Sequence, residues 1–138
     1  PGLIEKNKIT VTGEVGRGLP QNPPGLSWPT ACLLLGPSPA LVGPDLAGSG
    51  VTGLVVEKND LNCTDAAGVM MTTLTRFNTL PPVENESSHN LFVKNDFNVS
   101  GSGSHVVLGS ETSHNSFIGS KGLELDEVQD EGTNNRFE

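Results

Sequence analysis

Long hydrophobic stretches are missing from this sequence of 138 residues, of which only 34% are hydrophobic. No apolar run approaches the roughly 20 residues that span a bilayer, so we expect no membrane insertion. Basic clusters are missing as well, because eight Lys and Arg side chains are scattered among sixteen acidic ones, for a formal net charge of -8. This distribution offers phosphates no electrostatic footprint, and nucleic acid is therefore not an expected partner.

Cysteine and aromatic residues are scarce too: there are two Cys, one Trp and no Tyr. Cys32 and Cys63 are compatible with a single disulfide but do not make a disulfide framework. Each lies in a strand-like stretch, where a small buried core residue is the simpler interpretation.

Turn-forming residues are abundant, with 17 Gly and 10 Pro. Short apolar clusters at 33–35, 54–56 and 106–108 are each bounded by such residues, which indicates many short strands and few long helices. A chain of this length is expected to form one domain around one core.

The strongest feature is an internal repeat at 3–12, 55–64 and 91–100. All three copies share an apolar pair, Lys-Asn, a charged residue and then an alternation of apolar and polar residues. A second repeat, Ser-His-Asn-x-Phe, occurs at 88–92 and 113–117 and in degraded form at 133–137. Its phenylalanines recur at intervals of 25 and 20 residues, plausible lengths for one coil of a solenoid.

Repeats of this kind are explained by coils that stack as parallel strands, because equivalent residues then lie above one another. Asn7, Asn59 and Asn95 are the candidates for an asparagine ladder, in which stacked amides hydrogen-bond along the column. Asparagine also tolerates the left-handed backbone conformation of a sharp bend. The 52 residues from Asn7 to Asn59 fit two coils, or one coil with a long excursion. The predicted excursions are the Gly- and Pro-rich stretch at about 13–29 and the stretch at about 75–88, where Pro81-Pro82 forbids a central strand.

The recurring K-N-D-[FL] and N-x-F elements, with V-V-E-K-N before one of them, resemble the right-handed parallel β-helix superfamily, the pectate-lyase-like proteins. This resemblance covers about 50–137 well and 2–13 clearly. It implies an all-β solenoid of about four to five coils. It leaves the function open, since the superfamily includes polysaccharide lyases and hydrolases, adhesins and non-catalytic repeat proteins.

Outward carboxylates are the best candidates for chemistry. Asp60 and Asp96 occupy the same repeat position, and in adjacent coils they would lie about 5 Å apart, close enough to share a proton or a cation such as Ca²⁺. Lys8 holds this position in the first copy, which favours a charged, solvated bend instead.

Other polar columns have equally plain interpretations. Lys58 and Lys94, with Lys6, would form a row that binds an acidic polysaccharide or simply keeps the solenoid soluble. His89 and His114 are expected to stack and to bond to Ser88 and Ser113 rather than to hold a metal. The acidic stretch at 124–131 is expected to be an exposed loop, with Ca²⁺ binding as the alternative.

The sequence therefore favours a non-catalytic β-helix module with a structural, adhesive or carbohydrate-binding role in an extracellular or cell-surface protein. The alternative is a fragment of a polysaccharide lyase or glycoside hydrolase in which Asp60 and Asp96 act. The repeats begin and end abruptly, so further coils or a partner chain are expected at the ends.

Overall fold

The computed structural model describes residues 2–13, 31–36, 50–71 and 86–138. In these residues the chain is all-β, as expected, with one short 3-10 helix and three parallel sheets. Sheet A contains, in spatial order, β1 (Leu3–Glu5), β4 (Val55–Glu57), β7 (Leu91–Val93), β10 (Ser116–Ile118) and β12 (Arg136–Phe137). Sheet B contains β2 (Lys8–Thr12), β5 (Asp60–Thr64) and β8 (Asp96–Ser100). Sheet C contains β3 (Ala31–Leu34), β6 (Ala67–Met71), β9 (Val106–Leu108) and β11 (Val128–Asp130).

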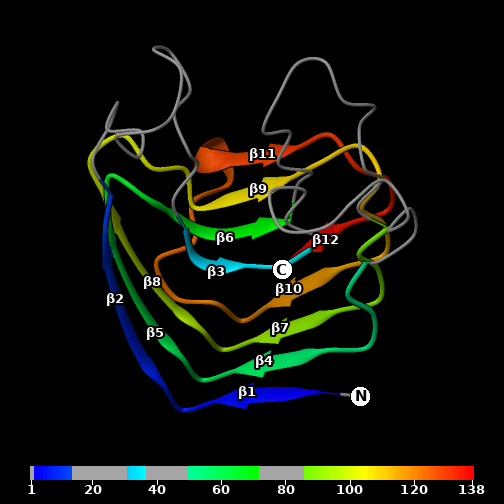
Figure 1. Ribbon diagram of the computed structural model, residues 1–138, viewed down its shortest axis with the longest axis horizontal. Helices are drawn as coiled ribbons and strands as arrows, with labels where there is room; N and C mark the ends of the chain where they lie inside the picture. The colour runs from blue at the N-terminus through cyan, green and yellow to red at the C-terminus, as the bar shows by residue number, and fades with distance from the viewer. Residues whose placement is uncertain (1, 14–30, 37–49, 72–85) are drawn as a thin grey trace, which may run out of the picture.

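The chain visits sheets A, B and C in the same order again and again, and we call one such traverse a pass. Pass 1 is β1, β2 and β3, pass 2 is β4, β5 and β6, and pass 3 is β7, β8 and β9. Pass 4 is β10 and β11, and β12 opens pass 5. In Figure 1 the bends that join β1 to β2, β4 to β5 and β7 to β8 lie one above another, so that the strands of sheet A stack in one direction and those of sheet B in another. This arrangement is compatible with a parallel β-helix.

The register between passes follows the first repeat. Leu3 pairs with Val55, and Val55 pairs with Leu91, so the 52 residues from Asn7 to Asn59 make a single pass. In sheet B, Leu61 pairs with Phe97. Both side chains are buried, whereas Asn98, the next residue of β8, is exposed. The predicted alternation of inward apolar and outward polar residues is confirmed in β8, because successive strand residues face opposite sides.

The core fills the interior that the three sheets enclose. Phe92, Phe117 and Phe137 stack through passes 3, 4 and 5, with ring centroids 4.3 and 5.0 Å apart, so their spacings of 25 and 20 residues are each one pass. Around this column pack fully buried apolar side chains, namely those of Val56, Leu61, Cys63, Val69, Met71, Val106 and Leu108.

The bends between sheets A and B correct one expectation. The left-handed conformation falls on the residue before each ladder asparagine: φ is 55° at Lys6, 54° at Lys58 and 53° at Lys94. Ladder asparagines are therefore not needed at these positions for their backbone tolerance. Their side-chain amides stabilise the bend through hydrogen bonds, while the preceding lysine adopts the left-handed conformation. For a residue other than glycine this conformation costs roughly 1–2 kcal/mol of conformational energy.

Two further expectations change. Cys32 and Cys63 form a disulfide between β3 and β5, with a Cα–Cα distance of 6.1 Å, so the interpretation as two unbonded core residues is wrong. The acidic stretch at 124–131 is not a plain loop: it holds the 3-10 helix η2 (Leu125–Glu127) and then β11, which pairs with β9.

The predicted excursions at 13–29 and 75–88 fall almost entirely outside the described residues. Those of their residues that are described belong to the stack: the Gly13 N–H donates to the Thr64 carbonyl, and Ser88 forms bridges with Thr52 and Ser113. The part of the chain that the structure covers contains no helix long and apolar enough to cross a membrane.

Candidate functional site

The three predicted ladder asparagines lie in one column at the bend between sheets A and B. Asn7 donates from both its backbone N and its Nδ2 to Asn59 Oδ1, at 3.0 and 3.1 Å, and Asn59 donates in the same way to Asn95 Oδ1, at 3.0 and 3.0 Å. Asn59 Nδ2 also donates to the carbonyls of Ile4 and Glu57. Asn59 and Asn95 are buried, so these amides supply partners to backbone groups that water does not reach.

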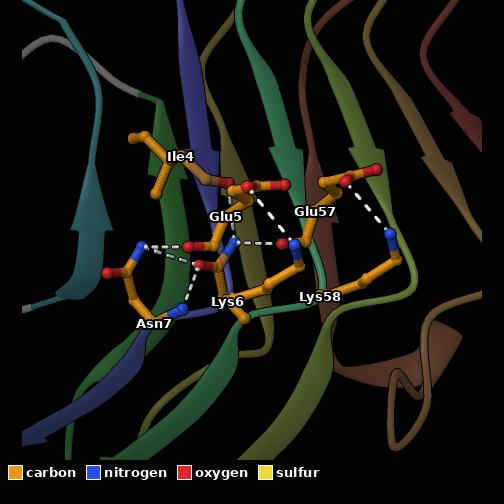
Figure 2. Close-up of polar contacts among 7 residues, drawn as sticks. Ile4, Glu5, Lys6, Asn7, Glu57 and Lys58 are labelled. Atoms are coloured by element: carbon orange, nitrogen blue, oxygen red, sulfur yellow. Dashed lines mark hydrogen bonds and ion pairs between the residues drawn. The ribbon is translucent and has the colours of Figure 1, made fainter.

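Beside the ladder runs the column of lysines. Lys6 pairs with Glu5 at 3.4 Å and Lys58 pairs with Glu57 at 3.1 Å, as Figure 2 shows. Glu5 and Glu57 are themselves register partners. In pass 3, Val93 replaces the glutamate, and Lys94 has no carboxylate partner among the described residues. Of the two lysines predicted to bind ligand, Lys58 is thus already engaged and Lys94 is the available cation.

The Glu57 carboxylate is perturbed by the charges around it. Its pKa is lowered, chiefly by the hydrogen bond from Lys58 and further by the charges of Lys58 and Lys6. Partial burial opposes this lowering of the pKa. The carboxylate is therefore held in its charged form and stays paired with Lys58.

Asp60 and Asp96 are register partners on neighbouring strands of sheet B, at the position predicted for a catalytic pair. Each is bound to a different neighbour. Asp60 Oδ1 accepts a hydrogen bond from Asn98 Nδ2 at 3.0 Å, and Asp96 Oδ2 pairs with Lys121 Nζ at 3.2 Å. The column thus reads Lys8, Asp60, Asp96, Lys121, in which a cation stands at each end of a pair of carboxylates.

Beyond this charged column, the outer face of sheet B carries uncharged hydrogen-bonding groups in two further columns. These columns are Thr10, Asn62 and Asn98, and Thr12, Thr64 and Ser100. Thr64 Oγ1 and Ser100 Oγ are 3.3 Å apart. Asn62 Nδ2 is shielded from solvent and has no hydrogen-bond partner among the described residues. We call these two columns the polar face.

A second ladder, which the sequence reasoning did not recognise, lies where each pass enters sheet A. Asn90 donates from its N and Nδ2 to Asn115 Oδ1, and Asn115 donates in the same way to Asn135 Oδ1. Its left-handed residues are His89, His114 and Asn134. The sequence does contain a signal for this second ladder, the Ser-His-Asn repeat. Like Lys-Asn, it places an asparagine directly after the residue with positive φ.

The histidines of this second ladder stack as expected, with ring centroids 5.0 Å apart. The hydrogen-bond partner of His114 differs from the prediction, because its Nε2 lies 3.4 Å from Asn134 Nδ2 rather than against a serine. In the parts of the chain that the structure describes, no group of three or more His, Cys, Asp or Glu side chains is placed to hold a metal ion.

Comparison with known proteins returned no matching family model, no matching curated protein and no matching solved structure.

Proposed function

We propose that this chain is a non-catalytic module of an extracellular or cell-surface protein, built as a right-handed parallel β-helix of the pectate-lyase-like architecture, with a structural and carbohydrate-binding role. The observation that carries the proposal is the polar face. Its hydroxyl and amide groups repeat in register from pass to pass, at the spacing of about 4.8 Å between neighbouring strands. A polysaccharide that lies along the stack would meet a hydroxyl or amide group of each column at each of passes 1, 2 and 3.

The expected ligand is a neutral polysaccharide. The net charge of -8 opposes the approach of an acidic polymer, and of the three stacked lysines only Lys94 has no carboxylate partner among the described residues. Sugar hydroxyls both donate and accept hydrogen bonds, and so do the Thr, Ser and Asn side chains of the polar face.

The pairing of the aspartates supports a module over the alternative, a fragment of a lyase or hydrolase. An acid and base pair needs one carboxyl group free to give a proton and the other free to take one or to attack. Asp60 and Asp96 are instead bound to Asn98 and Lys121, partners from the neighbouring passes. The disulfide supports the proposed location, since such bonds persist in oxidising compartments.

Binding to an array of neutral and acidic polysaccharides tests the proposal. We expect the protein to bind neutral polymers, and we expect the double variant Thr12→Val and Thr64→Val to lose at least about tenfold in affinity, because two hydroxyls of the polar face are removed with little change in shape. Thr133→Val is the matched control, an exposed threonine outside sheet B. Equal loss in the control, or binding to no neutral polymer, would contradict the proposal.

A further inference from the structure

Sheet B ends earlier than the other two sheets. Sheets A and C continue into pass 4 with β10 and β11, whereas pass 4 meets sheet B only through one bridge, between Asp96 and Lys121. From Lys121 to Val128, pass 4 is three residues shorter than the equivalent stretch of pass 3, from Asp96 to Val106. Pass 4 therefore takes a shorter path between sheets B and C, and no described residue pairs with the rest of β8 on this side.

This part of β8 presents backbone groups toward pass 4. Along a strand, alternate residues direct their N–H and C=O groups to opposite neighbours. Asp96 N donates to Asn59 of pass 2, and Phe97 N donates to Lys121 of pass 4. The N–H and C=O of Val99 therefore point to the side of pass 4, where no residue of the described chain pairs with them.

A groove lies along this open edge, with a volume of about 410 Å³. Its lining includes residues 97–101, from β8 and the residue after it, and Gly122, Glu124 and Glu127 of pass 4. Gly122 has φ of 69°, and a Cβ there would lie 2.3 Å from the Phe97 carbonyl oxygen, so a glycine is needed where pass 4 turns away from β8.

Two glutamates, Glu124 and Glu127, line the groove, and a hydrogen bond holds the backbone of one of them in place. His105 is 7% exposed, and its Nδ1 accepts a hydrogen bond from the Glu124 N–H at 3.1 Å. This bond fixes the backbone that carries Glu124. Both Glu124 and Glu127 are exposed and have no ion-pair partner among the described residues. The nearest cation of pass 4, Lys121, is already paired with Asp96.

We infer that this groove binds an extended basic peptide, which adds as a strand to the free edge of β8. Unpaired strand edges are templates for such addition, in which main-chain hydrogen bonds supply affinity and side chains supply selectivity. The Val99 N–H and C=O provide the main-chain contacts, and the carboxylates of Glu124 and Glu127 select lysine or arginine. The groove shares Asn98 and Ser100 with the polar face, but the contacts that would hold the peptide, the Val99 backbone and the two carboxylates, are not part of that face.

Peptides that separate these two contributions test the inference on the whole chain. The probe is a capped peptide of alternating lysine and threonine, with a glutamate–threonine peptide as the charge control and a backbone N-methylated lysine–threonine peptide as the pairing control. We expect the first to bind, and hydrogen exchange at the Val99 amide to slow by at least about tenfold. The Phe97 amide, already bonded to Lys121, is the internal reference.

The double variant Glu124→Gln and Glu127→Gln should weaken binding by at least about fivefold, whereas Glu111→Gln, an exposed glutamate outside the groove, should not. Three results would each overturn the inference. The N-methylated peptide could bind as well as its parent, Val99 exchange could stay unchanged at saturating peptide, or a neutral glucan oligomer could protect Val99 where the peptide does not.

Discussion

At the scale of single residues, the ladder asparagines connect passes that are far apart in the sequence. Asn59 Nδ2 donates to the Ile4 carbonyl in pass 1 and to the Glu57 carbonyl at its own bend. The backbone N and Nδ2 of Asn59 also donate to Asn95 Oδ1 in pass 3. Each of these bonds replaces one that water would make in the unfolded chain, so the asparagine matters most through what its removal leaves unpaired.

We predict that Asn59→Ala lowers the free energy of unfolding by about 3 kcal/mol or more, since each buried group left unsatisfied costs about 1–3 kcal/mol. Asn7→Ala removes the same amide from the exposed end of the column, where water replaces the lost bonds, and should cost roughly 1 kcal/mol or less. Urea unfolding of the two variants measures the difference. Equal losses would show that burial does not set the strength of the ladder.

The Glu57–Lys58 ion pair predicts a pH dependence. Because the pKa of Glu57 is lowered in the folded protein, the pair stabilises the fold above the ordinary pKa of a glutamate, and this stability is lost as the pH falls through the lowered value. Lys58→Met should raise the pKa of Glu57 toward its ordinary value, and Lys8→Met should leave it unchanged. An NMR titration of the Glu57 side-chain carboxyl carbon measures both, and an unchanged pKa in Lys58→Met would rule out the assigned cause.

The sequence was enough to place the first ladder because Lys-Asn recurs beside an unmistakable alternation of apolar and polar residues. The left-handed backbone conformation was expected at Asn7, because asparagine accepts it more easily than lysine does. The structure has it one residue earlier, at Lys6. In pass 4 the pattern was too faint to detect. There Gly119 and Ser120 occupy the positions of Lys94 and Asn95.

At the scale of elements, the disulfide joins strands from different sheets and different passes. Cys32 lies in β3 of sheet C and Cys63 in β5 of sheet B. The two sequence positions are 31 apart, so the bond closes a long loop in the unfolded chain. The sequence left open whether this bond forms, because that depends on how sheets B and C face each other across the core.

Reduction of this disulfide should lower the free energy of unfolding by about 2–4 kcal/mol, chiefly because the unfolded chain gains conformational freedom. Urea unfolding with and without a reductant measures the change, and the double variant Cys32→Ala and Cys63→Ala is the control that reductant must not affect. If reductant left the wild-type stability unchanged, the bond would not constrain the chain.

Two features of pass 4 also lay beyond the sequence. The acidic stretch contains β11, which the low apolar content of Val128–Asp130 concealed, because an edge strand half open to solvent needs few inward apolar residues. The shorter path of pass 4 beside β8 appears only when the passes are in register, since it is a difference in length between two stretches with little sequence similarity.

At the scale of the whole molecule, the part of the stack that the structure describes carries its repeated polar groups on the outer face of sheet B. Sheet B turns two columns of uncharged groups outward, while the carboxylates beside them are bound to neighbouring passes. Such an arrangement fits a module that holds an extended polymer and leaves it intact.

Release of product from a bound polysaccharide is the most direct measurement of this account. The polymers bound in the array are incubated with the wild-type chain and with the double variant Asp60→Asn and Asp96→Asn, with and without Ca²⁺, and new reducing ends and unsaturated products are quantified. The account predicts that both proteins bind and that neither releases product. Product formed by the wild type and abolished in the double variant would contradict it and identify the aspartates as catalytic.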